Sequence, residues 1–439
     1  MKKKVIVSIL LASMTAGLFA GCGSSSQTTE TNASDTKTEE TASSDAAAEG
    51  EIEINFPCIW VGTDSKAEVF GQMVEAFNTE YDGTYQVNIE EQTDYDAYQD
   101  LIRTQISTGS APDIFTVKTQ ADVEYYSSSG KCADLTEFLA GDIAANFVQG
   151  AVDNAKLDGV NYAVPYEMAY IPIMYNQKEL DEAGTSVPTS FDELWQTNEA
   201  LAASGVTPMC QMTGGGNAWT TMLWYSYALA ATGGADVYSK DYTDEAYVKA
   251  AELIREMYQY TNSDAVGADA SVVNGHFFNG DDAIYTNGTW ILGRINSDEA
   301  TYPDLYENLG LGSGLSYEGE NGNAFISYCQ AYIMVGAQED EAKTEAIEAF
   351  LAYITDPEKV LELSNSSGSL FAMNIDASAM TNEKAAEAYA LAQAADFIIP
   401  SFESQASTNV ANAFPSLLEE LILGDIDAAE FAQALADAE

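Results

Sequence analysis

The chain has 439 residues, of which 46% are apolar, and this is enough to form full globular cores. It carries 17 basic and 69 acidic residues, so its formal net charge is −52. Nucleic acids and anionic lipid surfaces bind proteins through basic patches, so the composition argues against both as partners. Solubility is the simplest explanation of the acidity.

Residues 1–21 have the organisation of a secretory signal peptide. Consecutive lysines are followed by a mostly apolar run that ends at Leu18, and small residues come next. The segment Phe19-Ala20-Gly21-Cys22 resembles the lipobox of bacterial lipoproteins, in which the cysteine takes a diacylglycerol and becomes the new N-terminus. The resemblance implies lipidation of Cys22, although Phe19 stands where leucine is usual. An ordinary signal peptide with an incidental cysteine is the alternative.

Residues 22–50 predict a disordered tether. After Cys22 the segment is rich in Ser, Thr and acidic residues, and it contains no aromatic residue and no Leu, Ile, Val or Met. It cannot bury enough apolar surface to offset the entropy lost on folding. The apolar run before it is too short to span a membrane, and no later run of about 20 apolar residues follows. We therefore expect a body over 51–439, long enough for two domains, that is held at a membrane through the lipid only.

Strands and helices alternate at the start of this body. Periodicity predicts strands over 51–61 and 84–90, helices over 65–81 and 94–107, and a third strand beginning at 112–115. This order predicts an α/β fold with a doubly wound sheet.

The pattern then becomes mainly helical. We expect helices over 191–204, 219–231, 245–260, 340–355, 414–423 and 428–438, and a strand over 324–335. Ser190 and Glu193 fit a capping box at the start of the first of these helices.

The cysteines and the single histidine give no metal signature. Besides Cys22, the chain contains Cys58, Cys132, Cys210 and Cys329. No C-x-x-C motif occurs and His276 is the only histidine, so we expect no zinc site, no other metal and no cofactor. The four cysteines are free or one pair is bridged, and the sequence does not decide between these states.

Short motifs occur in a fixed order along the body. They are Trp60 after the first strand, TQISTGSAPDIF at 104–115, GKCADL at 130–135, GVNYAVP at 159–165, MYNQ at 174–177, VPTSFDEL at 187–194 and DAIYTNGTW at 282–290. Together they resemble the extracellular solute-binding proteins of bacterial ABC importers, specifically the maltose-binding-protein-like family 1 that binds sugars. Gln177, Phe191 and Ile284 depart from the usual residues, and the last two exchange one apolar side chain for another.

The resemblance implies a two-lobed periplasmic-binding-protein fold, type II-like, in which each lobe is a sheet flanked by helices. It predicts lobe 1 over 51–168 and 310–337, lobe 2 over 169–309 and 338–439, and about three crossings of the hinge. A ligand that touches both lobes favours the closed state. The family delivers a carbohydrate to the transmembrane subunits of a permease and catalyses no reaction. We expect a monomer, anchored at the outer face of the cytoplasmic membrane of a single-membrane bacterium.

Sugars have apolar faces edged by hydroxyl groups, so they require aromatic platforms and polar side chains. In the lobe 1 loops, the expected ligand-binding residues are Trp60, Thr63, Asp64, Lys66, Thr116 and Lys118. At the hinge and in lobe 2 they are Tyr166, Glu167, Asn217, Trp219, Asn287, Trp290 and Phe371. Trp290 is the first choice, because the aromatic residue of the family's G-x-W motif usually stacks on the sugar.

Structural roles are the alternatives for several of these residues. Trp60 and Trp219 could pack in a core, Asp64 could cap a helix, and Glu167 could form a salt bridge, since an unpaired buried carboxylate is costly.

Two other functions remain open. The same fold could bind a polyamine or a peptide, and the carboxylates of Asp64 and Glu167 would suit a cation. A secreted glycoside hydrolase would need two carboxyl groups facing each other at about 5 to 10 Å across a sugar. The acidic residues are too numerous for their spacing to exclude this, and the series of motifs favours a binding protein.

Overall fold

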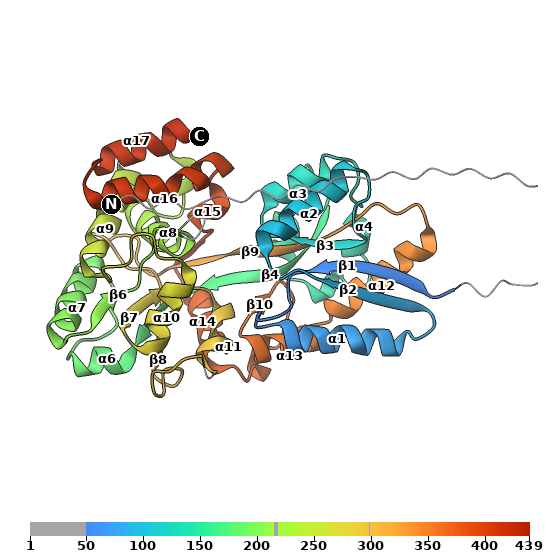
Figure 1. Cartoon of the computed structure of the whole chain (residues 1–439), viewed down its shortest axis with the longest axis horizontal. Coiled ribbons are helices and arrows are strands. Elements are labelled where there is room, and N and C mark those ends of the chain that lie inside the picture. Colours follow the sequence, from blue (N-terminus) through green and yellow to red (C-terminus); the bar gives the residue numbers. More distant parts are fainter. Residues whose placement is uncertain (1–49, 215–217, 298) are drawn as a thin grey trace, which may run out of the picture. The chain divides into compact units, whose positions relative to one another are not determined.

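The computed structural model describes residues 50–214, 218–297 and 299–439. Residues 50–439 form one compact unit (Figure 1). The predicted signal peptide, Cys22 and the tether up to residue 49 lie outside the described residues, as does Asn217. In the described part of the chain, no helix is long and apolar enough to cross a membrane.

The alternating elements predicted at the start of the body are confirmed. They are β1 (Ile52–Cys58), α1 (Ala67–Glu80), β2 (Tyr85–Glu91), α2 (Tyr95–Ser107) and β3 (Ile114–Val117). Strands β1 and β2 pair in parallel, as expected for strands joined by a helix. Strand β3 instead pairs antiparallel with a strand more than 200 residues later, β9 (Ala324–Val335). By their hydrogen bonds, β1 and β2 therefore form a two-stranded sheet of their own, and β3 belongs to a larger sheet built around β9.

The longest pairing joins β4 (Ala163–Ile171) to β9, antiparallel. Short strands β10 (Leu370–Phe371) and β11 (Phe397–Ile399) complete this sheet at either side, in the order β10-β4-β9-β11. A second sheet has the order β6-β7-β5-β8. Its strands are β5 (Ile173–Asn176), β6 (Thr207–Met209), β7 (Asp282–Thr286) and β8 (Leu309–Gly312).

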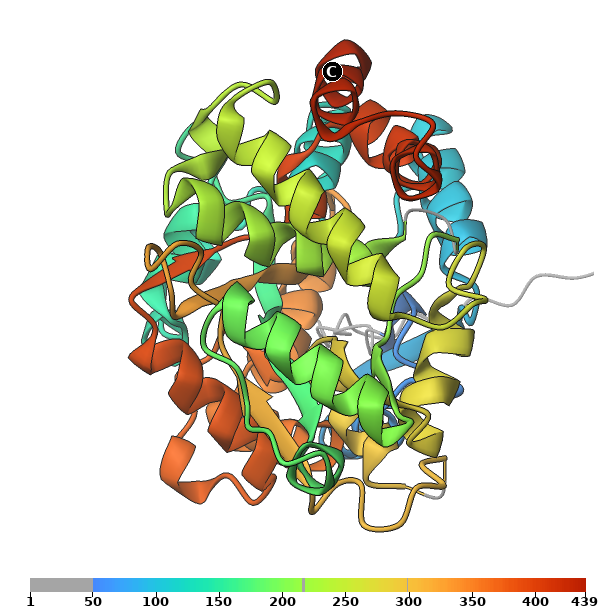
Figure 2. The ribbon, with the colours of Figure 1, turned by 90° about the vertical axis from the view of Figure 1, so that its left-hand side faces the viewer.

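Helices flank both sheets (Figures 1 and 2). Before β5 they are α3 (Gln120–Ser127), α4 (Thr136–Ala140) and α5 (Gln149–Asn154). The middle of the chain holds α6 (Gln177–Glu182), α7 (Phe191–Ser204), α8 (Trp219–Gly233), α9 (Glu245–Met257), α10 (Ala270–Asn279), the 3₁₀ turn η4 (Thr289–Ile291) and α11 (Leu292–Ile295). The last part holds α12 (Glu341–Ile354), α13 (Pro357–Ser367), α14 (Glu383–Ala394), α15 (Phe402–Gln405), α16 (Thr408–Leu423) and α17 (Ala428–Ala438).

Strands β4 and β9 take part in two separate cores. Tyr166 of β4 and Ile333 of β9 pack with β1 and α1 in the first core. Ile171 of β4 and Ile326 of β9 pack with α8 and α9 in the second core. The same two strands therefore connect the two packed bodies, and Figure 1 shows them running from one group of helices to the other. A third connection is the segment 376–382, which leads from the first core to α14.

The predicted lobe boundaries stay a prediction, and the cores favour a modified version. Helices α12 and α13 were assigned to lobe 2, but their apolar faces pack in the first core with β1. Residues 310–328 were assigned to lobe 1, but β8 pairs with β5 of the second sheet. We therefore propose a first lobe that includes residues 341–375 and a second lobe that includes residues 309–326.

The predicted capping box at α7 is half formed. The Ser190 hydroxyl accepts a hydrogen bond from the backbone N–H of Glu193 at 3.2 Å. The Glu193 carboxylate, however, accepts from the N–H of Thr189 at 2.8 Å and not from that of Ser190. The helix still begins and ends where the sequence predicted it. The four cysteines of the body, whose state the sequence left open, are free thiols.

Candidate functional site

An ion network lies where β4 meets the loop after β1. The ammonium Nζ of Lys66 is 3.1 Å from Oδ1 of Asp64 and 3.2 Å from Oε1 of Glu167. The hydroxyl of Ser369, in the loop between α13 and β10, donates to the same Oε1 at 2.7 Å. Three segments that are distant in sequence are thereby joined around the Glu167 carboxylate.

The Lys66 ammonium offsets the carboxylate charge of this network. Lys66 and Glu167 are 3% and 4% exposed, so a lone charge at either position would be costly. Burial lowers the pKa of the Lys66 ammonium, but the carboxylates of Glu167 and Asp64 outweigh it and raise the pKa above its usual value. Lys66 therefore stays protonated between the two carboxyl groups. The salt bridge considered for Glu167 is present, and its ligand contact stays a prediction.

Three of the predicted aromatic residues are core residues. Trp60 is 2% exposed and lies edge-on to Phe70, with ring centroids 4.9 Å apart, and 5.0 Å from Tyr166. Tyr166 is fully buried and donates its hydroxyl to the carbonyl of Ile354. Phe371 packs against the Tyr166 ring at 5.2 Å. These rings pack inside the first core, so in this structure they present no face to a ligand.

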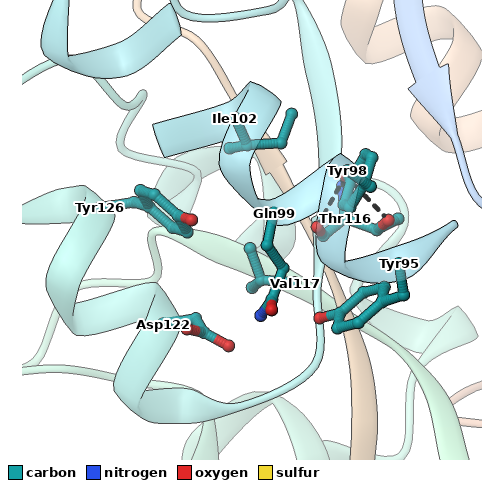
Figure 3. A pocket seen from close by; sticks show the side chains of 8 residues that line it. All are labelled: Tyr95, Tyr98, Gln99, Ile102, Thr116, Val117, Asp122 and Tyr126. Carbon is teal, nitrogen blue, oxygen red and sulfur yellow. Dashed lines mark hydrogen bonds between the residues drawn. The ribbon is translucent and has the colours of Figure 1, made fainter. Parts of the chain in front are cut away.

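Thr116 is also enclosed. Its N–H donates to the hydroxyl of Tyr98 at 2.7 Å, and that hydroxyl donates to the Thr116 carbonyl at 2.8 Å (Figure 3). The hollow beside it, between α2 and α3, has a volume of ≈ 10 Å³, which is room for about one water. This hollow is too small for a sugar.

Lys118 and Thr63, in contrast, are exposed. The Lys118 ammonium lies over the ring of Tyr95, 3.7 Å from its centroid. Desolvation lowers the pKa of Lys118, although the carboxylates of Glu403 and Glu167 oppose this effect. An exposed ammonium that is partly desolvated and faces carboxylates from β4 and α15 is suited to donate hydrogen bonds to a bound solute.

Trp219 and Trp290 are the predicted aromatic residues that lie near each other without being enclosed. Both side chains are half-buried, and their ring centroids are 6.2 Å apart at an interplanar angle of 44°. Gly288 makes room for Trp290, because a Cβ at Gly288 would lie 2.0 Å from Cζ3 of the indole. Neighbouring Asn287 is buried and donates to the hydroxyl of Tyr285 at 2.9 Å, which is a structural role.

The tryptophan segment adjoins the ion network. A Cβ at Gly368, which has φ +80°, would lie 2.8 Å from the carbonyl oxygen of Thr289. Ser369, which follows Gly368, donates to Glu167. The α13–β10 loop thus contacts both the residue before Trp290 and the network carboxylate. Sequence reasoning selected Phe371 from this loop and missed Ser369, although a Gly-Ser pair directly before an apolar strand is a signal for close backbone contact.

A larger hollow of ≈ 490 Å³ lies elsewhere, among η2 (Val237–Ser239), α9, α15 and α17. Its lining includes Tyr242, Phe402 and Gln405 but none of the predicted site residues. The ligand cleft expected between the lobes therefore stays a prediction. The residues that support it are the ion network around Glu167 and the pair Trp219 and Trp290.

The comparisons with known proteins identify the family. The family model described as "Bacterial extracellular solute-binding protein" matches residues 72–393. The chain belongs to this family. The chain is 22% identical over 205 residues to a "Probable sugar-binding periplasmic protein" of Brucella suis. The matched region covers 44% of this chain and 48% of that protein. It is 26% identical over 238 residues to the "Alpha-glucosides-binding periplasmic protein AglE" of Rhizobium meliloti, covering 50% and 49%.

Thus the chain spans about half the length of the curated relatives that it matches. Solved structures cover more of it. A "Chitin oligosaccharide binding protein" superposes with a TM-score of 0.76 at 20% identity, over 88% of this chain and 98% of that chain. RafE in complex with raffinose gives a TM-score of 0.70 at 20% identity, over 88% and 98%. These likenesses confirm the two-domain solute-binding fold that the motifs predicted.

Proposed function

We propose that this member of the solute-binding family captures a carbohydrate, most simply an oligosaccharide, and delivers it to the transmembrane subunits of an ABC importer. The observation that carries the proposal is the pairing of half-buried Trp219 and Trp290 close to the segment that contacts the Glu167 network. Indole rings offer a platform to the apolar face of a sugar, and carboxylates accept hydrogen bonds from its hydroxyls. The family and the printed names of the relatives support the same ligand class.

Within this proposal the ligand-binding residues are a reduced set of those predicted. The surface groups Thr63, Asp64, Lys118, Trp219 and Trp290 remain candidates for direct contact, with Glu167 as the acceptor behind them. Lipidation of Cys22, the monomeric state, the permease partner and the absence of catalysis are parts of the same proposal.

A thermal-shift screen tests the ligand class. The full-length mature protein is heated alone and with maltotriose, raffinose, chitobiose or a xylo-oligosaccharide. A ligand present at 100 times its dissociation constant should stabilise the fold by about 2.7 kcal/mol. Spermidine and a short peptide are the matched non-sugar arms, because carboxylates at the site would also attract a cation.

Stabilisation by a saccharide supports the proposal, and stabilisation by spermidine or the peptide alone contradicts it. Incubation with the same oligosaccharides also tests the absence of catalysis, since release of reducing sugar would identify a hydrolase.

A further inference from the structure

Two enclosed side chains hold the carboxylate of Glu167 from different parts of the chain. Lys66 donates to Oε1 at 3.2 Å from the loop after β1, and Ser369 donates to Oε1 at 2.7 Å from the α13–β10 loop. Lys66 is 3% exposed and Ser369 is 1% exposed. The Lys66 ammonium contacts the carboxylates of both Asp64 and Glu167, and the Ser369 hydroxyl donates its proton to Glu167, so the donors of both side chains are engaged within the network.

The second carboxylate oxygen of Glu167, Oε2, accepts neither of these hydrogen bonds. Among the described residues, both hydrogen bonds that the carboxylate accepts end on Oε1, which leaves Oε2 for another donor. The register between β4 and β9 also shifts on both sides of Glu167, between Pro165 and Glu167 and between Glu167 and Met168. Such irregularities re-aim a side chain out of the regular alternation of a strand.

We propose that Lys66 and Ser369 are positioning residues: Lys66 balances the charge of the Glu167 carboxylate and, together with Ser369, fixes Oε1, so that Oε2 faces a hydroxyl of the ligand, and neither residue touches the ligand itself. This inference rests on the proposed function, because it gives Glu167 a ligand to accept from. It replaces the direct ligand contact that the sequence predicted for Lys66.

The charges around Glu167 show why Lys66 has this role. The titratable groups that face Glu167 or its network are Cys58 on β1, Lys66 and Asp64 from the loop after β1, Lys118 after β3, Tyr166 on β4 and Cys329 on β9. Glu403 on α15 faces Lys118 in turn. Of these, Lys66 is the cation within hydrogen-bond distance of the carboxylate. Replacing Lys66 by an uncharged residue leaves the carboxylates of Glu167 and Asp64 beside each other without this cation. Glu167 is buried, and both burial and a neighbouring like charge raise a carboxyl pKa.

The first test needs no ligand. The free energy of unfolding is measured by denaturant titration from pH 4 to 8 for wild type, Lys66→Met and Lys66→Met/Glu167→Gln. Without Lys66, the pKa of Glu167 in the folded state should exceed its unfolded value of about 4.3. A carboxyl group with a raised folded pKa stabilises the fold below the unfolded pKa, and this stability is lost as pH rises through the folded pKa. Lys66→Met should therefore lose stability with rising pH, and adding Glu167→Gln should remove most of that slope.

Lys343→Met is the matched control. Lys343 forms a half-buried ion pair with Asp113 at 2.8 Å, away from Glu167. Any pH slope that Lys343→Met acquires should persist when Glu167→Gln is added. A slope of Lys66→Met that survives Glu167→Gln would overturn the proposal.

The second test measures saccharide binding by calorimetry, with maltotriose, raffinose and chitobiose as probes. Ser369→Ala should weaken binding about tenfold or more, the size expected for losing a hydrogen bond to a charged group. Ser364→Ala is its control, because the Ser364 hydroxyl is buried nearby without a hydrogen-bond partner among the described residues. Lys66→Met should weaken binding more at pH 5 than at pH 8, since protonated Glu167 is the poorer acceptor.

Equal weakening by Lys66→Met at every pH would show that Lys66 contacts the ligand directly, and would overturn the proposal. Wild-type affinity of Ser369→Ala would do the same, and it would do so even if Lys66→Met did not fold. If wild type binds none of the saccharides, the proposed function fails and the ligand-facing role of Oε2 fails with it. The pH slope then separately decides whether Lys66 balances the charge of the Glu167 carboxylate.

Discussion

Trp219 and Trp290 differ from the other aromatic residues of the predicted site in one respect: their side chains are half-buried, whereas Trp60 and Tyr166 are enclosed in a core. An aromatic ring can stack on a ligand only if one of its faces is exposed, whereas a ring enclosed in a core can only pack against other side chains. The sequence could not make this distinction, because residue type and local pattern do not show which aromatic side chains the fold encloses. Burial depends on neighbours such as Phe70, which only the fold brings close.

Replacing Trp290 by alanine should weaken saccharide binding by about 1 to 3 kcal/mol, the scale of an aromatic platform. Calorimetry with the best saccharide of the thermal-shift panel measures the change. Trp195→Ala is the control, since Trp195 is a half-buried tryptophan that stacks on Tyr260 with ring centroids 6.1 Å apart. Equal losses in both variants, or none at Trp290, would contradict the stacking role.

Gly288 should be as sensitive as Trp290 itself. A methyl group at this position would overlap the indole, so Gly288→Ala should displace the ring and weaken saccharide binding while Trp290 remains in the chain. Gly275→Ala is the control, because a Cβ at Gly275 in α10 meets no atom within 4 Å. Tryptophan fluorescence and calorimetry report the displacement and its effect. Wild-type binding by Gly288→Ala would show that the ring position is not critical.

At the scale of elements, α10 contacts the loop containing Asp264, which in turn contacts the backbone before α8. His276 in α10 is 3.1 Å from Asp264 and 3.5 Å from Asp281. The loop containing Asp264 also pairs with the backbone before α8, where the N–H of Thr213 donates to the carbonyl of Ala265 at 3.0 Å. The single histidine, for which the sequence suggested no role, thus belongs to a structural clamp.

The clamp should make stability depend on pH. Burial lowers the pKa of His276, but the carboxylates of Asp264, Asp282 and Asp281 outweigh it and raise the pKa. A raised His pKa stabilises the fold below the unfolded value of about 6.5, and this contribution is lost as pH rises through the folded pKa. His276→Gln should therefore destabilise the fold by up to about 1 kcal/mol below about pH 6, and its difference from wild type should disappear as pH rises through the folded pKa of His276, as expected for partly exposed pairs.

Denaturant titrations of wild type and His276→Gln from pH 4 to 9 measure this difference. Asp282→Asn separates a second contribution, because burial raises the pKa of Asp282 to about 6. Its stabilising contribution is present below about pH 4 and is lost as pH rises from about 4 to about 6, which is a lower range than that of His276. Identical pH profiles of wild type and His276→Gln would contradict the clamp.

Local signals predicted elements well where caps and periodicity agreed. Strand β9 and helices α7 and α17 occur where the sequence placed them. Helix α13 was not among the predicted helices, because the sequence analysis ended one helix at residue 355 and placed no further element before residue 414. In the structure Asp356 caps a new helix that has proline in its first turn. Helix α16 begins at Thr408, earlier than the predicted residue 414. Pro415 therefore lies inside the helix, where proline is usually disfavoured because it lacks the backbone N–H.

The candidate site was predictable in part. Glu167 stood out because a carboxylate in an apolar stretch needs a partner. The partners themselves lie 101 and 202 residues away, at Lys66 and Ser369, and no local pattern reveals such pairings. The same limitation explains why Lys66 was assigned to the ligand when it is committed to two carboxylates.

At the scale of the whole molecule, the expected lipid anchor can be tested in cells. Cys22→Ser removes the only thiol that could carry the lipid, so the variant should appear in the soluble extracellular fraction while wild type stays with the membrane. Cys58→Ser, at a buried free thiol of the body, is the control for cysteine replacement. Membrane association of Cys22→Ser equal to that of wild type would contradict the anchor. An unchanged thermal-shift response of the released protein would show that solute capture is independent of it.

The packing of α12 on β1 has a consequence for how the chain matures. The first core contains the earliest strand and helices formed near the end of synthesis, so a growing chain cannot close that core until most residues are available. Topologies with such distant contacts fold slowly, because long loops must close before the contacts stabilise them. Slow closure would leave the chain open until α12 and α13 have been made, and an open chain is the form that the proposed export across a membrane requires.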